Sequence, residues 1–201
     1  TGLVSVQDAA AQLAAPLLLQ NHVPDTPMRV LDACAAPGGK TAHLLELADV
    51  QLSALDIDPQ RCTRIRQTLD RLGLPANVVA ADAARPQDWW DGQMFDAILL
   101  DAPCTASGIV RRHPDVPWLR READIAALVA VQSALLRALW PLLRVGGRMV
   151  YCTCSVFRDE GDIQIQTFVG HNSDARLLPS PGHLLPQLTA NGASVPDNPV
   201  S

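Results

Sequence analysis

Short apolar segments alternate with longer amphipathic segments along most of this chain. Five apolar runs have the length and side-chain pattern of buried strands, at residues 28–33, 51–57, 77–81, 95–100 and 148–153. Four further segments carry apolar residues at helical spacing, at residues 39–47, 59–72, 124–143 and 163–170. Strands that alternate with helices are typical of a mostly parallel sheet with helices on both faces. The pattern therefore predicts an α/β fold.

This alternation covers only the middle of the chain. Residues 28–171 are expected to form one core domain, and residues 1–27 an N-terminal helix with a linker that leads into the core. Beyond the core, Pro, Gly, Ser and Asn dominate and leucines are scattered. Residues 172–201 are therefore predicted to be an irregular tail.

The N-terminal helix has both a start signal and an interruption. Ser5 and Asp8 are spaced as the N-cap and N3 residues of a capping box, and the segment rich in Ala and Leu after them extends to about Leu19. Pro16 should kink or shorten the helix, because proline lacks a backbone donor and clashes with the preceding turn. The sequence thus predicts one helix over residues 5–19 that is bent or shortened at this proline.

Composition narrows the class of protein. With 201 residues, 48% hydrophobic and 18% charged, the chain suits one globular domain and not a disordered segment. Its apolar runs are too short to span a bilayer and no signal peptide opens it, so no membrane association is expected. Five cysteines without regular spacing argue against a disulfide framework and favour a reducing compartment. We expect a cytoplasmic monomer.

The stretch RVLDACAAPGGKTAHLL, residues 29–45, is the strongest candidate for a ligand site. It predicts a strand, a Pro-Gly-Gly turn and a helix, which leaves backbone N–H groups free at the helix start. Gly38 and Gly39 have no side chains, so a ligand can come close to the main chain there. In open α/β sheets, ligands bind outside the carboxyl ends of the strands, which is where this turn falls.

Two phosphate-binding motifs fit this turn poorly. The dinucleotide fingerprint G-x-G-x-x-G is absent. A P-loop would end in Gly39-Lys40-Thr41 and use Asp101 as its metal-binding aspartate, but its first glycine falls on Cys34. The segment Ala35-Ala36-Pro37 does not suit a phosphate cradle either. An ATPase is therefore a distant alternative.

S-adenosylmethionine fits the same turn better. Its carboxylate would bind the N–H groups of the turn, and its ribose hydroxyls would bind Asp56 at the end of the second strand. Asp82, at the end of the third strand, would approach the adenine, and Asp101 ends the fourth strand. Each aspartate alone also suits a turn or helix cap. Three of them at strand ends favour a ligand with ribose, amine and sulfonium groups but no phosphate.

Two cysteines follow the last two strands of the predicted sheet. Cys104 lies in Asp-Ala-Pro-Cys and Cys154 in Tyr-Cys-Thr-Cys-Ser, so both fall at the ligand-facing edge. As thiols, Cys34 and Cys62 are interpreted as packing residues, and Cys152 shares a strand face with Cys154. A zinc site built from such thiols and a histidine lacks any C-x-x-C or H-x₃₋₅-H spacing, so no metal is predicted.

Two thiols and a carboxylate beside a methyl donor have a specific chemical use. Carbon 5 of cytosine is too weak a nucleophile to take a methyl group unaided. A thiolate that adds to carbon 6 makes carbon 5 enamine-like, and the covalent adduct divides one difficult step into easier ones. A carboxyl group such as that of Asp101 at the N3/N4 edge would favour this addition. A second cysteine could then assist the elimination of the first.

Four motifs carry a resemblance to a known family. They are LDACAAPGGKT (31–41), ALDIDPQR (54–61), FDAILLDAPCTASG (95–108) and GGRMVYCTCS (146–155). With SVQDA at residues 5–9, they make the chain resemble RNA 5-cytosine methyltransferases of the NOL1/NOP2/Sun type. The stretch 109–121 is most similar to bacterial members that act on small-subunit (16S) ribosomal RNA. The resemblance implies a Rossmann-like, S-adenosylmethionine-dependent methyltransferase fold and carbon-5 methylation of a cytosine in that RNA.

The resemblance also implies roles for individual residues. Cys154, in Thr-Cys-Ser, would be the nucleophile and Cys104 would help to release the product. This reverses the assignment that the Pro-Cys nucleophile of DNA cytosine methyltransferases suggests. Asp101 would complete the catalytic set. The residues that would hold the cofactor are Cys34, Ala35, Ala36, Pro37, Gly38, Gly39, Lys40, Asp56, Arg61, Asp82 and Asp101.

A dense basic stretch follows Cys104, in and just after a long predicted loop over residues 105–119. The net charge of −5 argues weakly against nucleic acid, but binding needs only a local basic face. These side chains are candidates for phosphate contacts, with a solvated loop as the alternative. The target base must leave its stack, and Trp118 is the nearest aromatic residue. The candidate RNA-binding residues are Arg111, Arg112, His113, Arg120 and Arg121.

The chain departs from the family pattern at both ends. Family members of this type carry an N-terminal helical RNA-binding domain that this sequence lacks. They also close with a strand like Asp-Gly-Phe-Phe, which nothing in residues 184–201 matches. Two alternatives follow. The same residues could methylate another RNA, such as tRNA, or the chain could be a non-catalytic module that binds RNA or the cofactor.

Overall fold

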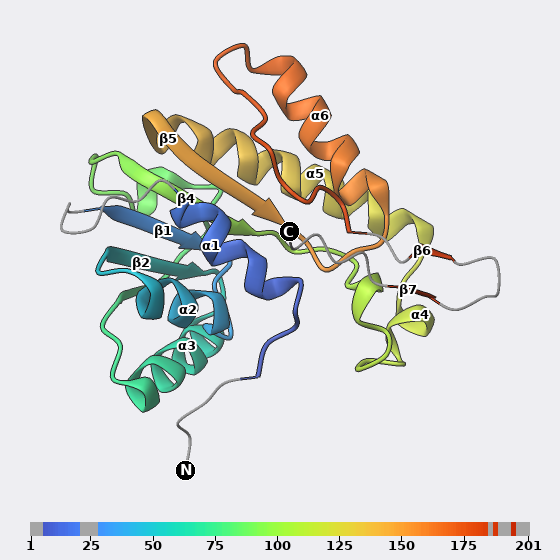
Figure 1. Cartoon of the computed structure of the whole chain (residues 1–201), viewed down its shortest axis with the longest axis horizontal. Helices are drawn as coiled ribbons and strands as arrows, with labels where there is room; N and C mark the ends of the chain where they lie inside the picture. The colour runs from blue at the N-terminus through green and yellow to red at the C-terminus, as the bar shows by residue number, and fades with distance from the viewer. Residues whose placement is uncertain (1–5, 21–27, 185–186, 189–193, 196–201) are drawn as a thin grey trace.

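A five-stranded parallel sheet forms the centre of the computed structural model, which describes residues 6–20, 28–184, 187–188 and 194–195. The strand order is β3-β2-β1-β4-β5, and each neighbouring pair is parallel. The strands are β1 (Arg29–Ala33), β2 (Gln51–Asp56), β3 (Asn77–Ala80), β4 (Phe95–Asp101) and β5 (Leu143–Cys152). The predicted α/β fold with a parallel sheet is confirmed (Figure 1).

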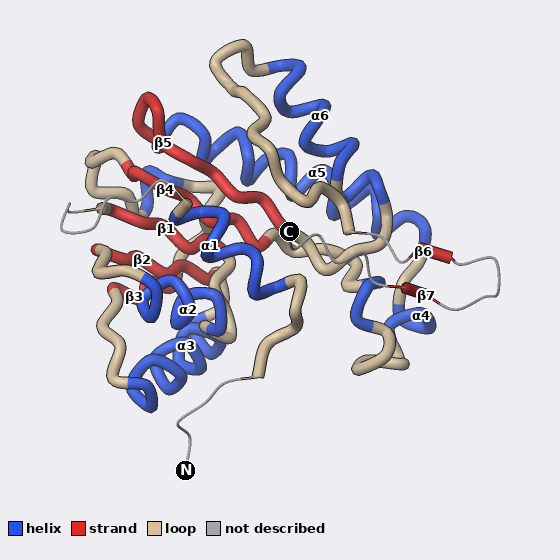
Figure 2. Tube along the Cα trace, in the orientation of Figure 1, coloured by secondary structure: helices blue, strands red, loops and turns tan. Residues whose placement is uncertain are grey.

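Helices cover both faces of this sheet (Figure 2). One face carries α1 (Ala14–Leu19), α2 (Gly39–Leu47) and α3 (Pro59–Leu72). The opposite face carries α5 (Glu122–Leu139) and α6 (Asp162–His171), while α4 (Val116–Leu119) lies beyond the sheet (Figure 1). Short 3₁₀ turns complete the chain, namely η1 (Ala11–Leu13), η2 (Pro86–Asp88), η3 (Ser107–Ile109), η4 (Trp140–Leu142) and η5 (Arg158–Glu160).

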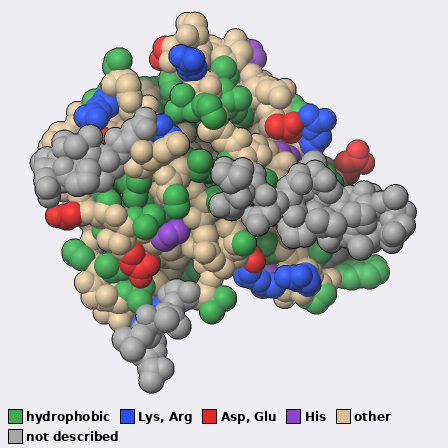
Figure 3. Space-filling model, viewed as in Figure 1, with side chains coloured by type: hydrophobic (Ala, Val, Ile, Leu, Met, Phe, Trp, Pro, Cys, Tyr) green, Lys and Arg blue, Asp and Glu red, His purple; other side chains and the backbone are tan. Residues whose placement is uncertain are grey.

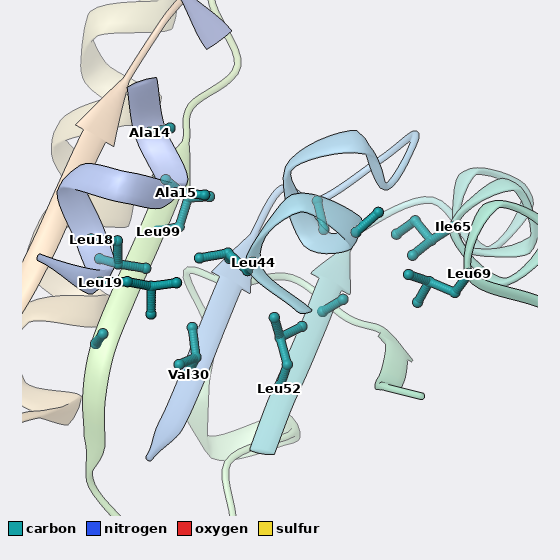
Figure 4. Packing of buried hydrophobic residues seen from close by; sticks show 14 residues of the cluster. Ala14, Ala15, Leu18, Leu19, Val30, Leu44, Leu52, Ile65, Leu69 and Leu99 are labelled. Atoms are coloured by element: carbon teal, nitrogen blue, oxygen red, sulfur yellow. The ribbon is translucent and has the colours of Figure 1, made fainter. Parts of the chain in front are cut away.

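Successive residues of each strand point to opposite faces of the sheet, and this builds two cores. On one face, Val30 of β1 and Leu52 of β2 share a cluster with Leu44 of α2 and Ile65 of α3 (Figure 4). Leu99 of β4 extends this cluster toward α1. All five side chains are almost completely buried, so this core fixes α2, and with it the turn that precedes α2.

The second core lies between the sheet and α5. Leu31 of β1 and Ile98 of β4 share a cluster with Leu135, Leu136 and Leu139 of α5. By length and composition alone, α5 together with η4 is apolar enough to cross a membrane. Its buried leucines account for part of this apolar character, as expected of a helix that packs on a sheet.

The N-terminal helix is shorter than the sequence predicts. It begins as the 3₁₀ turn η1 at Ala11 and continues as α1 from Ala14. Ser5, the predicted N-cap, lies outside the described residues. Pro16 falls in the first turn of α1, where a missing N–H costs little, so the proline belongs to the start of the helix and does not kink it.

β5 begins at Leu143, earlier than the predicted start at residue 148, because the chain forms a bulge between the predicted helix and strand. The register between β4 and β5 shifts between Phe95 and Ala97, and Gly146 has φ +76°. Glycine adopts this left-handed conformation without a steric penalty, so the chain continues as a strand. The helix predicted to run to residue 143 accordingly ends at Leu139 and is followed by η4.

Two segments that the sequence predicts to be irregular contain short regular elements. The loop over residues 105–119 holds η3 and α4. The tail over residues 172–201 holds an antiparallel pair, β6 (Gln187–Leu188) and β7 (Ser194–Val195). Elements of two to four residues carry too little periodicity to be recognised from a sequence pattern.

Candidate active site

Chemically active side chains gather at one edge of the sheet, because the carboxyl ends of parallel strands meet there. Asp56 is the last residue of β2, Asp101 the last of β4 and Cys152 the last of β5. The turn that begins at Cys34 follows β1 directly, and Cys154 lies just beyond β5. The structure therefore brings these predicted site residues to a common edge.

The turn between β1 and α2 adopts a left-handed backbone conformation at two positions. Gly38, the N-cap of α2, has φ +98°, and a Cβ there would lie 3.2 Å from the Cα of Ile65. Cys34 has φ +61°, which is uncommon for a residue with a side chain, and the Ala36–Pro37 peptide is cis. Among the residues that the structure describes, no side chain caps α2. Its first N–H groups are therefore available to an anionic ligand.

Asp56 holds this turn against the second strand. Its Oδ2 accepts a hydrogen bond from the N–H of Ala36 at 3.3 Å and lies 3.4 Å from the guanidinium of Arg61. Arg61 also donates to the carbonyl of Ala36 at 3.2 Å, and the N–H of Asp58 donates to Oδ1 of Asp56 at 3.1 Å. Both predicted cofactor ligands, Asp56 and Arg61, therefore order the turn itself. A ribose would bind a carboxylate that already has partners.

Asp82 lies just beyond β3 and caps a local turn. Its Oδ1 accepts a hydrogen bond from the N–H of Ala84 at 2.9 Å, and its carbonyl oxygen accepts one from the indole N–H of Trp89 at 3.0 Å. The side chain is half-buried. This geometry agrees with the turn-cap alternative, and a contact between Asp82 and adenine stays a prediction.

Asp32 is a buried carboxylate beneath the turn, and the sequence analysis did not identify it as a candidate site residue. Asp32 of β1 is completely buried, and its Oδ2 accepts a hydrogen bond from the hydroxyl of Thr41 at 2.6 Å. Its Oδ1 has no hydrogen-bond partner within the described part of the chain. Burial, more than any neighbouring charge, raises the pKa of Asp32 to about 7. The only signal in the sequence was a single polar residue inside an apolar strand.

Lys40 connects the turn to the cysteines. Its ammonium Nζ lies 2.7 Å from Oδ2 of Asp101, and both side chains are largely shielded from solvent. The other carboxylate oxygen of Asp101 lies 3.6 Å from the thiol of Cys152, which donates to it. Asp101 therefore stands between the turn and the thiols, where a carboxyl group could contact a base.

The thiols of Cys104 and Cys154 are in contact, with 3.4 Å between the sulfur atoms. Either thiol can donate in this contact. With Cys104 as the donor, the hydrogen bond lowers the pKa of Cys154 despite partial burial of that thiol. The same hydrogen bond, together with burial, raises the pKa of Cys104. Cys154 is also the exposed member of the pair. The pair therefore favours a thiolate, the nucleophilic form, at Cys154.

The other cysteines are held as neutral thiols. Burial raises the pKa of Cys152 well above its usual value, and the carboxylate of Asp101 adds to this shift. Burial also raises the pKa of Cys34 to about 12 and that of Cys62 above its usual value. Cys62 is completely buried, as the packing interpretation predicts. Among the described residues, no group of three or more His, Cys, Asp or Glu is arranged to hold a metal ion.

The loops that carry the two thiols are joined closely. The N–H of Gly108 donates to the carbonyl of Cys154 at 2.8 Å, and a Cβ on this glycine would lie 2.8 Å from the same oxygen. Only glycine therefore fits there. Glu160, completely buried, accepts hydrogen bonds from Thr105 and Ser155 in the two loops. Sequence reasoning missed Glu160, which is one of several acidic residues near a helix start.

The predicted RNA-binding residues lie in a basic loop at the end of the molecule that carries α4. Two of them have partners in the chain, since Arg112 forms an ion pair with Asp8 and Arg120 donates to the carbonyl of Thr105 at 3.0 Å. Trp118 in the same loop is 89% exposed. Figure 3 shows Lys and Arg side chains gathered at this end. The exposed basic residues are Arg111, Arg112, His113, Arg120 and Arg121.

The sheet and the edge that carries the turn define the class of protein. NSun6 from Pyrococcus horikoshii, solved with SFG, is similar with a TM-score of 0.73 and 29% identity, over 88% of this chain and 46% of its own. A methyltransferase homologue from the same organism is similar with a TM-score of 0.75 and 34% identity, over 94% of this chain and 58% of its own. The chain has a Rossmann-like methyltransferase fold.

Sequence comparison then identifies the family. The model of the 16S rRNA methyltransferase RsmB/F family matches residues 17–194, and the chain belongs to that family. Ribosomal RNA small subunit methyltransferase B of Vibrio cholerae is 52% identical over 180 residues, which are 89% of this chain and 41% of the relative. The protein of the same name from Pseudomonas syringae is 53% identical over 180 residues, 88% of this chain and 39% of the relative. The chain thus spans about two fifths of these relatives, and the resemblance carried by the motifs is confirmed.

Proposed function

We propose that this protein is an S-adenosylmethionine-dependent methyltransferase that acts on carbon 5 of a cytosine in small-subunit ribosomal RNA. Membership of the family and the names of the relatives support a ribosomal RNA substrate. The contact between the thiols of Cys104 and Cys154 is the observation that supports methylation at carbon 5. Transfer to a nitrogen or oxygen atom, which already holds a lone pair, needs no thiolate adduct, whereas carbon 5 of cytosine does.

The turn after β1 offers what S-adenosylmethionine needs. The uncapped start of α2 suits the methionine carboxylate. A Cβ at Gly39 would have only the side-chain amide nitrogen of Gln7 near it, at 3.9 Å, so the main chain can be approached closely there. A similar structure was solved with SFG, an analogue of S-adenosylmethionine, which supports the same ligand here. The proposed cofactor residues are those that the sequence predicts, residues 34–40 with Asp56, Arg61, Asp82 and Asp101.

The reaction would begin at Cys154. Its thiolate adds to carbon 6 of the cytosine, and the new C–S bond pushes electron density toward carbon 5 and the N3 edge. Asp101 is held by Lys40 at 2.7 Å, and its charge acts on the thiol of Cys154, so it would contact that edge and favour the addition. S-adenosylmethionine, when bound, supplies the methyl group that carbon 5 takes.

Cys104 would act at the end of the reaction. Carbon 5 loses its proton to a base, the C5–C6 double bond forms again, and the C–S bond breaks with both electrons on the sulfur of Cys154. The S–H of Cys104 lies 3.4 Å from that sulfur and stabilises the departing thiolate. One proton is released for each methyl group transferred, and Cys154 returns to its starting state.

The basic loop supports an RNA substrate at this site. Arg111 and Arg121 are exposed at the end of the molecule that carries α4, and they suit phosphate contacts. The exposed indole of Trp118 offers a surface for an unstacked base. With ribosomal RNA as its substrate, the protein would act in the cytoplasm.

A covalent trapping experiment tests this function. The chain is incubated with labelled S-adenosylmethionine and unmodified small-subunit rRNA, as wild type and as the variants Cys104→Ala and Cys154→Ala. We expect methyl transfer by the wild type, an accumulating protein–RNA adduct with Cys104→Ala, and neither adduct nor transfer with Cys154→Ala. The opposite pattern would exchange the two roles.

Two outcomes of the same experiment would favour the alternatives. Transfer to tRNA but not to rRNA would retain the chemistry and replace the substrate. Binding of S-adenosylmethionine without transfer to any RNA would indicate a binding module. Since the chain spans about two fifths of its relatives, the longer relatives serve as positive controls in every arm.

A further inference from the structure

Glu160 is a buried carboxylate that binds the residue after each of the two active-site cysteines. Its Oε1 accepts a hydrogen bond from the backbone N–H of Thr105 at 3.0 Å. Its Oε2 accepts hydrogen bonds from the hydroxyl of Thr105 at 2.5 Å and from the hydroxyl of Ser155 at 2.6 Å. Thr105 follows Cys104 and Ser155 follows Cys154, so one side chain fixes both loops next to their thiols.

Two further elements hold Glu160 in place. The side-chain amide of Gln132, in α5, donates to Oε1 at 3.1 Å and to the carbonyl of Pro103 at 2.9 Å. The hydroxyl of Tyr151, in β5, donates to the carbonyl of Glu160 at 2.7 Å. In the described part of the chain, no ion pair includes Glu160. Burying a carboxylate without a cation is unfavourable, so its four neutral donors must hold it firmly.

We propose that Glu160 is a positioning residue that keeps the S–H of Cys104 directed at the sulfur of Cys154. This inference rests on the proposed function, because it gives Glu160 a part in the thiol chemistry of that reaction. Backbone hydrogen bonds also join the two loops, but they do not set the direction of either thiol. By fixing Thr105 and Ser155, Glu160 sets the 3.4 Å separation of the sulfur atoms on which the thiolate depends.

The variant Glu160→Gln tests this proposal, because the pKa of Cys154 should change in opposite directions under the two possible roles of Glu160. Glutamine keeps the shape but presents an N–H₂ group to the hydroxyl of Thr105 or Ser155, so the network is disrupted. If Glu160 acted on the thiols only through its charge, removing that charge would lower the pKa of Cys154. If Glu160 positions Cys104, the variant loses the S–H hydrogen bond and the pKa of Cys154 rises.

The pH dependence of Cys154 alkylation by iodoacetamide, located by peptide mass spectrometry, measures this shift without RNA or cofactor. We expect Glu160→Gln to slow alkylation near neutral pH about tenfold, because a raised pKa leaves less of Cys154 as the reactive thiolate. In methyl transfer, kcat should fall about 100-fold while KM for S-adenosylmethionine hardly changes. The control Gln164→Leu removes another buried polar side chain, which donates to the carbonyl of Val129, and should leave the alkylation profile unchanged.

An unchanged or lowered pKa of Cys154 in folded Glu160→Gln protein would overturn this inference. If that variant does not fold, Thr105→Val carries the test, because valine keeps the branched shape and the backbone N–H but loses the hydroxyl that donates at 2.5 Å. Its alkylation profile should shift in the same direction, and no shift would count against the inference equally. A wild-type protein that methylates no RNA would refute the proposed function, and the alkylation profiles would still decide the role of Glu160.

Discussion

The turn after β1 and the thiol pair share one edge of the sheet, yet they are held by different kinds of contact. The turn depends on backbone conformation and on the neighbouring strand, since Gly38 has φ +98° and Asp56 binds the N–H of Ala36. The thiol pair depends on side chains that come from distant parts of the chain. Thr105 and Glu160, which bind each other beside the pair, are 55 positions apart.

This difference indicates which steps each region controls. The turn joins β1 to α2 and is held by the adjacent strand β2, so substitutions there should act on cofactor binding and on local stability. The thiol pair forms only when β4, β5 and α5 have come together, so substitutions there should act on the chemical step. Lys40 and Asp101 join the two regions through their ion pair. If this division holds, the two regions respond separately to substitution.

The largest effect is expected beneath the turn, at Asp32. Its pKa is raised from 3.8 to about 7 in the folded protein, so between these values the folded state binds more protons than the unfolded state. The contribution of Asp32 to the free energy of unfolding is therefore greatest below about pH 4, falls as the pH rises to about 7 and then levels off. A difference of about 3 pKa units at 1.36 kcal/mol each amounts to about 4 kcal/mol. Asp32→Asn should abolish this fall and keep an acceptor for Thr41.

Urea unfolding at several pH values measures this effect as a difference between wild type and variant. Thr41→Ser is the matched control, because it keeps the hydroxyl that donates to Asp32 at 2.6 Å and should keep the pH dependence. Parallel stability curves for wild type and Asp32→Asn between pH 4 and pH 7 would contradict the prediction.

The second effect concerns Lys40, which links the two regions. Lys40→Met leaves the backbone N–H groups of the turn in place but removes the ammonium that lies 2.7 Å from Asp101. We expect cofactor affinity to be largely retained and single-turnover methyl transfer to fall about 100-fold, because Asp101 loses the contact that positions it. Equilibrium dialysis and rapid quenching measure the two quantities. Lys40→Arg, which keeps the charge, should recover part of the rate, whereas an equal loss of affinity would show that the regions are not separable.

The turn region was more fully predictable from sequence than the thiol region. A Pro-Gly-Gly turn between a strand and a helix is a local signal, and the structure places Gly38 at the start of α2 as that signal indicates. The strand-end positions of Asp56, Asp101 and the two cysteines also follow from local patterns. The contact between the two thiols does not, because nothing in the spacing of Cys104 and Cys154 shows that they share a proton.

What the sequence could not show depends on packing between distant segments. Glu160 has no local feature that separates it from other acidic residues, and only the folded chain buries it against Thr105. Gly146 lies outside the predicted strand over residues 148–153, but pairing with β4 makes it part of a bulge within β5. Asp32 is polar in sequence, and its raised pKa results from burial between the sheet and α2.

The third effect is a difference in stability between alanine substitutions at two adjacent glycines of the turn. Gly38→Ala places a side chain at φ +98°, with its Cβ 3.2 Å from the Cα of Ile65, and should destabilise the protein by about 2 kcal/mol. Gly39→Ala is the matched control, because the nearest atom to its Cβ is the side-chain amide nitrogen of Gln7 at 3.9 Å. Thermal or urea unfolding compares them. Equal losses of stability in the two variants would show that the left-handed conformation at Gly38 does not matter.

The smallest effect is expected at the thiol pair, in the reactivity of Cys154. Cys104→Ala removes the S–H that donates to Cys154, so the pKa of Cys154 should rise toward its usual value and alkylation near neutral pH should slow about tenfold. Cys152→Ala is the control, since its thiol contacts Asp101 and not Cys154. The cofactor affinity of both variants should match that of the wild type. A lower pKa in Cys104→Ala would mean that Cys154 is the donor of the pair, and the roles of nucleophile and releasing thiol would then have to be exchanged.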